Sequence, residues 1–271
     1  QRGRGGRGGG GEAQDMDIPL VPAHIRHRYV VVNKHTLADL CIEAAGIVRT
    51  LKNEKKGIGV LLFVRNRHIV DTVAQHLSLA KIKATGLHQS SSRQDRSRAF
   101  RLLAEGQLEV LVGTDMLARG LDIKGVTDIV NLGLARSTNM YLHRSGRAGR
   151  LQGKHAKHSQ VISILQPEEV ARMQAYSEVM NIDVIPSKRA QGKLQRLPSD
   201  EEEKFKPQRD KLPVVSHPLS PEAISFAGED DAAAFANPSG ALGRIIAKRK
   251  HLAHKAKNTP ARERYGRAAK R

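Results

Sequence analysis

A run of arginines and glycines, HRSGRAGR at positions 143–150, has the residue types that point most directly to chemistry. Arg144, Arg147 and Arg150 recur at every third position, so several guanidinium groups can share one surface. Guanidinium groups bind phosphate through paired hydrogen bonds and can stabilise the charge that develops on a transferring phosphoryl group. The segment therefore indicates a phosphate site, with a generic arginine-rich RNA-binding loop as the alternative.

A second cluster of polar residues lies upstream, in the segment VLVGTDMLARGLDI at positions 110–123. The segment begins as an apolar strand candidate and continues into a polar turn. In open α/β sheets, ligands bind at the carboxyl ends of the strands, so this turn is a candidate binding site. Its polar and glycine positions are Thr114, Asp115, Arg119, Gly120 and Asp122.

The two segments together resemble motifs V and VI of the superfamily 2 helicases, in the wording typical of DEAD-box RNA helicases. Residues 60–67 (VLLFVRNR) look like motif IV, and residues 126–144 look like the segment that leads into motif VI. The resemblance covers residues 22–185, which correspond to the second, C-terminal RecA-like domain of that family. It implies an α/β fold with a RecA-like, mainly parallel sheet and helices on both faces.

The resemblance also implies roles on the nucleotide side of the domain. Arg147 and Arg150 match the arginine fingers that point toward the γ-phosphate. Asp122 matches a contact to the nucleotide ribose, and Gly120 belongs to the same ATP-binding segment. We therefore expect these four residues to face ATP.

Other matching positions concern RNA and the partner domain. His143 and Arg144 match residues that couple this domain to the acidic motif of the first domain. The positions expected to hold phosphates of a single RNA strand are Arg96, Thr114 and Arg119, and Asp115 is also expected to be an RNA-binding residue. The chain departs from the family pattern near two of these sites, where it reads His88-Gln89 after motif IV and Asn131-Leu132-Gly133 before motif VI.

The 271 residues contain neither a Gly-x-x-x-x-Gly-Lys-Ser/Thr phosphate-binding loop nor an Asp-Glu-Ala-Asp motif. Those motifs hold Mg²⁺ and the nucleotide phosphates. We therefore expect ATP and Mg²⁺ as cofactors held mainly by a first RecA-like domain, which we place in the same polypeptide. This segment alone should be inactive. The scattered histidines and the single cysteine, Cys41, predict no metal site.

Short β-rich runs alternate with amphipathic segments from Arg26 onward, as in βαβ units around a parallel sheet. Apolar residues at helical spacing predict helices over 36–51, 67–79, 92–105, 137–145 and 167–180. The predicted strands are 27–32, 59–64, 83–87, 108–113, 127–132 and 159–165, with 181–185 as a candidate for the strand that closes the sheet. The domain is expected to end near Pro186, where the composition changes.

Both flanks are polar. Residues 1–21 form an Arg/Gly-rich linker or arm, and residues 186–271 form a basic, irregular extension. Within the extension, residues 239–257 predict a helix that either docks on a partner or stays solvated. The formal charge is +19, with 46 Lys and Arg against 27 Asp and Glu, which indicates a polyanionic partner. RNA is favoured over an anionic membrane surface, and no apolar run is long enough to span a bilayer.

These observations predict the C-terminal half of an ATP-dependent RNA helicase that remodels RNA or ribonucleoprotein, with ribosome assembly as the setting. The expected partners are RNA, ribosomal RNA in particular, and ribosomal or pre-ribosomal proteins. The alternative is a noncatalytic RNA-binding scaffold subunit of a large ribonucleoprotein that retains the RecA-like fold. A nucleolar or mitochondrial location is favoured over the cytoplasm.

Overall fold

The computed structural model describes residues 24–33, 36–55, 57–118, 123–148 and 159–205, together with residues 213 and 215. The predicted arm at 1–21 and the predicted helix at 239–257 lie outside these residues.

The strands are β1 (Arg26–Val31), β2 (Val60–Val64), β3 (Ala84–Leu87), β4 (Val110–Gly113), β5 (Asp128–Leu132), β6 (Gln160–Leu165), β7 (Val184–Ala190) and β8 (Lys193–Arg196). The helices are α1 (Leu37–Glu54), α2 (Val70–Leu79), α3 (Arg93–Ala104), α4 (Thr138–Ser145), α5 (Pro167–Met180) and α6 (Ser199–Glu203), with short 3₁₀ turns η1 (Arg67–Ile69) and η2 (Asp115–Ala118).

The strands form one sheet in the order β3-β4-β2-β5-β6-β1-β7-β8. All neighbouring pairs from β3 to β7 are parallel, and β8 alone runs antiparallel, beside β7. The central strands β2, β4, β5 and β6 are buried along their whole length, as strands covered on both faces must be. The prediction of a mainly parallel α/β sheet is confirmed.

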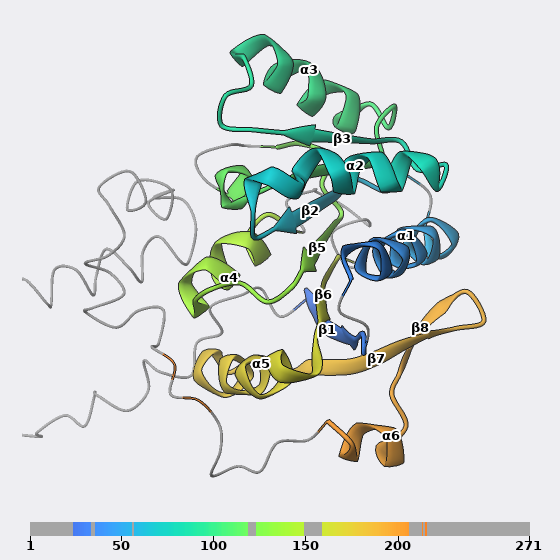
Figure 1. Ribbon diagram of the computed structural model, residues 1–271, viewed down its shortest axis with the longest axis vertical. Coiled ribbons are helices and arrows are strands. Elements are labelled where there is room, and N and C mark those ends of the chain that lie inside the picture. The colour runs from blue at the N-terminus through green and yellow to red at the C-terminus, as the bar shows by residue number, and fades with distance from the viewer. Residues whose placement is uncertain are drawn as a thin grey trace, which may run out of the picture.

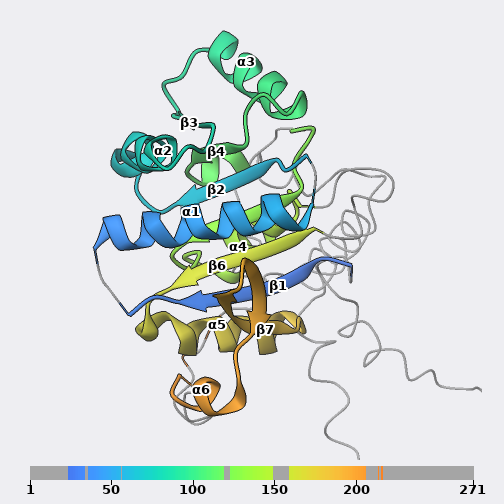
Figure 2. The same cartoon turned by 90° about the vertical axis from the view of Figure 1, so that its right-hand side faces the viewer.

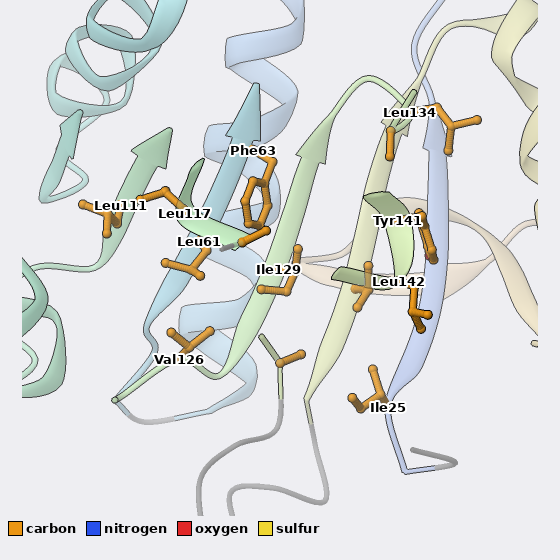
Figure 3. Close-up of a cluster of buried hydrophobic side chains, with 14 of the residues drawn as sticks. Ile25, Leu61, Phe63, Leu111, Leu117, Val126, Ile129, Leu134, Tyr141 and Leu142 are labelled. Carbon is orange, nitrogen blue, oxygen red and sulfur yellow. The ribbon is translucent and has the colours of Figure 1, made fainter. Parts of the chain in front are cut away.

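Helices cover both faces of the sheet (Figures 1 and 2). Because successive side chains of a strand point to opposite faces, β2 supplies Leu62 to one apolar core and Leu61 and Phe63 to the other. The first core packs under α1 and α2, and the second packs under α3, α4 and α5. Figure 3 shows the second core, in which Tyr141 and Leu142 of α4 lie against the strands. None of the described helices combines the length and apolar character needed to cross a membrane.

The sheet continues past residue 185, which the change of composition predicts as the end of the domain. β7 pairs with β1 through Pro186 and extends to Ala190, where it pairs with β8. Leu194 of β8 is buried in the core beneath α1, and Arg189 donates to Glu43 of α1 at 2.7 Å. Edge strands tolerate polar residues and proline, so a fall in apolar content does not end the sheet here.

A chain truncated after Ile185 is therefore expected to be less stable than one truncated after Phe205. The shorter chain loses the burial of Leu194, a contribution of about 2 kcal/mol, together with the pairing of β8. Thermal unfolding followed by circular dichroism measures the difference. The chain ending at Phe205 loses the contact of the partly buried Val215 with the second core, so its midpoint should lie only slightly below that of the 271-residue chain. Equal midpoints for the two truncations would show that the hairpin adds no stability.

Candidate functional site

The loops that follow the parallel strands gather at one edge of the sheet, because parallel strands have their carboxyl ends on the same side. A cavity of about 640 Å³ opens at this edge, beyond the ends of β2, β3 and β4. Thr114, a predicted RNA contact, lies in its wall. The lining residues are Arg67, His68, Val70, Asp71, Leu87, His88, Gln89, Ser90 and Thr114.

Most polar groups of the cavity can donate hydrogen bonds. Arg67 and His68 come from η1, directly after the segment that resembles motif IV, and both are exposed. Gln89 and Ser90 come from the loop between β3 and α3, where the sequence departs from the family pattern. Guanidinium, imidazole, amide and hydroxyl groups are the usual phosphate-contacting groups of nucleic-acid sites. The cavity can therefore bind the backbone of a nucleic acid.

Arg96 supports the loop that borders this cavity. It lies in α3, which Ser92 caps by accepting a hydrogen bond from the Asp95 backbone at 3.0 Å. The Arg96 Nη2 group donates to the carbonyl oxygen of Gln89. Its Nε group is buried without a hydrogen-bond partner among the described residues. Its predicted contact with RNA phosphate stays a prediction.

Arg144 lies inside the protein, and its side chain is 1% exposed. Its Nε donates to the Asp115 carboxylate at 2.5 Å, and its Nη1 donates to Asn131 Oδ1 at 3.0 Å. The guanidinium carbon also lies 5.0 Å from the centre of the Phe63 ring, within cation–π range. Arg144 thus joins α4, η2 and β5 within one domain.

The structure places both predicted residues in one ion pair. Arg144 is predicted to couple this domain to the acidic motif of another domain, and its guanidinium is covered in this structure. Asp115 is predicted to face RNA, and its carboxylate, which is 22% exposed, is held by Arg144. Both roles stay predictions. A buried guanidinium needs a counter-charge and hydrogen bonds to offset its lost hydration, and Asp115 and Asn131 provide them.

The hydrogen bonds continue from Asn131 across the core to the first strand. Asn131 donates to the Ser163 hydroxyl at 3.1 Å, and the Ser163 side chain in turn lies near the Tyr141 hydroxyl. Nδ1 of His27 then lies 2.9 Å from the Tyr141 hydroxyl. Asn131, Ser163 and Tyr141 are fully buried, and His27 is 3% exposed. Figure 3 shows Tyr141 and Phe63 in the core that these residues cross. The chain of contacts fixes α4, which carries the arginine-rich turn, to β1, β5 and β6.

The sequence does not reveal this network, since His27 and Tyr141 lie 114 positions apart. Tyr141 lies beside the arginine-rich segment, but nothing in the residues around it indicates a partner on the first strand. Only the order β5-β6-β1 in the sheet brings these residues together.

Burial lowers the pKa of His27 to about 4 from its ordinary value of 6.5. The folded state therefore keeps His27 neutral where the unfolded chain binds a proton, so the free energy of unfolding should fall as pH drops from 6.5 to 4. The full effect is about 3 kcal/mol. Urea titrations across this range should show the fall in the parent chain and a smaller one in His27→Gln, which keeps a hydrogen-bonding group but does not titrate. Equal pH dependence in both would exclude His27 as the source.

The arginine-finger positions lie just beyond α4. Ser137 caps α4 by accepting from the Met140 backbone at 3.1 Å, and the helix ends at Ser145, with Gly146 as the C-cap residue. Arg147 follows in the turn and is 5% exposed, whereas His143 is partly exposed. A guanidinium covered to this degree must be uncovered to reach a phosphate on another domain. The four remaining predicted site residues, Arg119, Gly120, Asp122 and Arg150, lie outside the described residues.

Arg65 fixes the loop that leads into α4. Its Nε donates to the Leu134 carbonyl at 3.0 Å and its Nη2 donates to Glu169, which also accepts from the Leu134 backbone at 3.1 Å. Gly133 has a φ of +85°, a conformation that glycine adopts without strain. The Gly133 that departs from the family pattern thus permits the turn on which α4 begins.

The described residues contain no group of three or more His, Cys, Asp or Glu side chains placed to hold a metal ion. Cys41 is buried, and burial raises the pKa of its thiol to about 11, so it serves in packing. The chemistry present here fits a surface that supplies cationic and hydroxyl groups to phosphates.

Comparisons with known proteins agree with this geometry. Residues 41–152 match the family model described as the helicase conserved C-terminal domain. The chain is 32% identical over 125 residues to the DEAD-box ATP-dependent RNA helicase CshC of Bacillus cereus, covering 46% of this chain and 31% of that protein. It is 34% identical over 166 residues to RhpA of Helicobacter pylori, covering 59% of this chain and 32% of that helicase. The chain thus spans about a third of the length of these curated relatives.

A solved structure extends the likeness to the fold. The DEAD-box protein SrmB of E. coli, solved in complex with the regulator of ribonuclease activity A, superposes with a TM-score of 0.52 at 25% identity. The match covers 65% of this chain and 98% of that chain. The RecA-like fold expected from the sequence is confirmed. The matched motifs, the parallel sheet and this superposition identify the chain as carrying the C-terminal RecA-like domain of a DEAD-box helicase.

Proposed function

We propose that this chain is the C-terminal half of an ATP-dependent RNA helicase. The proposal rests on two features that lie on the same domain. One is the cavity at the edge of the sheet, which is lined by residues that include Arg67, His88 and Thr114. The other is the arginine-rich turn after α4. One surface can thus contact an RNA backbone while another contacts a nucleotide. The relatives whose names state an activity are ATP-dependent RNA helicases, which supports this reading over a noncatalytic scaffold.

The residues of this chain would act as follows. Arg67, His68 and Thr114 contact phosphates of a single RNA strand at the cavity. Arg144 and Asp115 fix the start of the arginine-rich turn, and Arg147 stabilises charge on the γ-phosphate. ATP bound with Mg²⁺ on a first RecA-like domain supplies the phosphoryl group that is transferred to water. Closure of the two domains bends the bound strand, and this bend separates a short duplex.

We further propose ribosomal RNA as the substrate and ribosome assembly in the nucleolus or a mitochondrion as the setting. The support is the excess of 46 Lys and Arg over 27 Asp and Glu, which suits a large, densely charged RNA. Crosslinking of the protein to RNA in cells, followed by sequencing of the attached fragments, tests this assignment. Fragments dominated by messenger RNA would contradict it.

Replacing Arg67 with alanine is expected to weaken binding of single-stranded RNA and to reduce the salt dependence of that binding. Each phosphate contact contributes about −0.7 to the slope of log affinity against log salt for a single strand, so losing one contact should flatten the slope by about that amount. Fluorescence anisotropy with labelled oligouridine at several salt concentrations measures the slope.

Arg101→Ala is the matched control, because Arg101 is an exposed arginine of α3 whose nearest ion-pair partner, Glu105, lies 4.0 Å away. Both variants remove one positive charge, but only Arg67 lines the cavity. The same change of slope in both variants would show that binding depends on general charge, and it would count against the cavity as the RNA site.

A further inference from the structure

One acidic side chain stands among the hydrogen-bond donors of the cavity. Asp71 lies in the first turn of α2, and its side chain is 77% exposed. It is the one carboxylate among the residues that line the cavity. A carboxylate repels phosphate oxygens, so its presence opposes the binding of a nucleic-acid backbone.

Two neighbours hold the Asp71 carboxylate in place. Nε2 of His88 lies 2.8 Å from Asp71 Oδ1. Gly86 of β3 leaves room for the same oxygen, because a Cβ atom at that position would lie 2.7 Å from Oδ1. Within the described part of the chain, His88 is the one residue that hydrogen-bonds to this carboxylate. The remaining acceptor positions are therefore available to a ligand.

Stabilisation of α2 does not account for this arrangement. An acidic residue in the first turn of a helix interacts favourably with the helix dipole, and this effect explains why an aspartate stands at this position. It requires neither the contact with His88 nor a place in the wall of the cavity. A carboxylate that is positioned, exposed and partly unsatisfied is suited to accept a hydrogen bond from a ligand.

The backbone of a nucleic acid offers few groups that could donate this bond. An ionised carboxylate only accepts hydrogen bonds, and so do phosphodiester oxygens. The ribose 2′-hydroxyl is the donor of the RNA backbone, and DNA lacks it. A carboxylate beside a phosphate-binding surface therefore lowers the affinity for both nucleic acids by repulsion. Only RNA can offset this loss, because its 2′-hydroxyl can donate a hydrogen bond to the carboxylate.

We propose that Asp71, held by His88, accepts a hydrogen bond from a ribose 2′-hydroxyl and makes the cavity select RNA over DNA. This proposal rests on the proposed function, in which the cavity binds a nucleic-acid backbone. Asp71 is then a specificity-determining residue, and His88 is a positioning residue that orients it.

The experiment measures affinity of the 271-residue chain for three oligonucleotides of equal length at one fixed salt concentration. They are oligouridine, its 2′-fluoro analogue and its 2′-deoxy analogue, since the fluoro group cannot donate a hydrogen bond. In the parent chain, oligouridine should bind about threefold more tightly than either analogue, as expected for one exposed hydrogen bond. In Asp71→Ala this preference should disappear, and in Asp71→Asn, whose amide oxygen still accepts, part of it should remain.

Glu105→Ala is the control, because it removes one negative charge at the far end of α3, outside the cavity. It should leave the preference for oligouridine unchanged. If Asp71→Ala strengthens binding of all three oligonucleotides by the same factor, as the control does, the carboxylate only repels and the proposal is overturned. If the parent chain binds all three oligonucleotides equally, the selection by Asp71 is overturned. If it binds none of them, the proposed RNA site itself fails, which is a different result.

Discussion

Replacing Arg144 with methionine is expected to lower the free energy of unfolding by about 3 kcal/mol. Removing one member of a buried ion pair leaves its partner uncompensated and typically costs about 3–5 kcal/mol. The lower end applies because the Asp115 carboxylate, at 22% exposed, regains some water. The substitution also leaves the Asn131 side chain without the donor that lies 3.0 Å away. Urea denaturation of the 271-residue chain measures the change.

Three further variants test the reason for this loss. In Arg101→Met, an exposed arginine is removed from a pair 4.0 Å apart, and the cost should stay below about 0.5 kcal/mol. Asp115→Ala alone should be strongly destabilising, but it should add little once Arg144 is methionine, because the two residues act as a pair. Additive effects in the double variant would contradict the pairing seen here.

Replacing Arg147 with alanine is expected to abolish most ATP hydrolysis by the proposed helicase, in which a first RecA-like domain holds the nucleotide. An arginine finger accelerates phosphoryl transfer by about 10³–10⁵-fold when the nucleotide is already held, so the rate should fall by about 10³-fold. The affinity for RNA should change little, because Arg147 lies in the turn after α4 and does not line the cavity. Steady-state ATP hydrolysis with saturating RNA measures the effect.

Arg147→Lys separates charge from geometry. Lysine keeps the positive charge but not the planar, paired donors of arginine, so its rate should also be low. Arg101→Ala should keep the parent rate. A rate within tenfold of the parent in Arg147→Ala would show that Arg147 is no arginine finger, provided that thermal unfolding shows the variant to be folded.

Much of the fold follows from local patterns in the sequence. Strand β2 is a continuous apolar run, as expected for a strand covered on both faces, and α1 shows apolar residues at helical spacing. Helix α5 has Pro167 at its first position and glutamates in its first turn, signals that mark a helix start. Each of these features depends on residues close together in the chain.

The features that the sequence does not predict depend on distant contacts. An arginine within an arginine-rich motif is equally suited to a surface and to a buried pair, and only the position of Asp115 and Asn131 shows that Arg144 is internal. The hairpin of β7 and β8 also depends on a contact that is distant in the sequence. Its polar residues predict a loop, but Leu194 packs against the distant α1.

The central claim is tested most directly by RNA-dependent ATP hydrolysis. The natural polypeptide is purified from an extract with an antibody against this chain, and hydrolysis is measured with no nucleic acid, with single-stranded RNA and with single-stranded DNA. The account predicts a rate that rises severalfold with RNA and stays at the basal level with DNA. ATP hydrolysis that is absent, or that is unchanged by RNA, would contradict a helicase role and leave an RNA-binding scaffold.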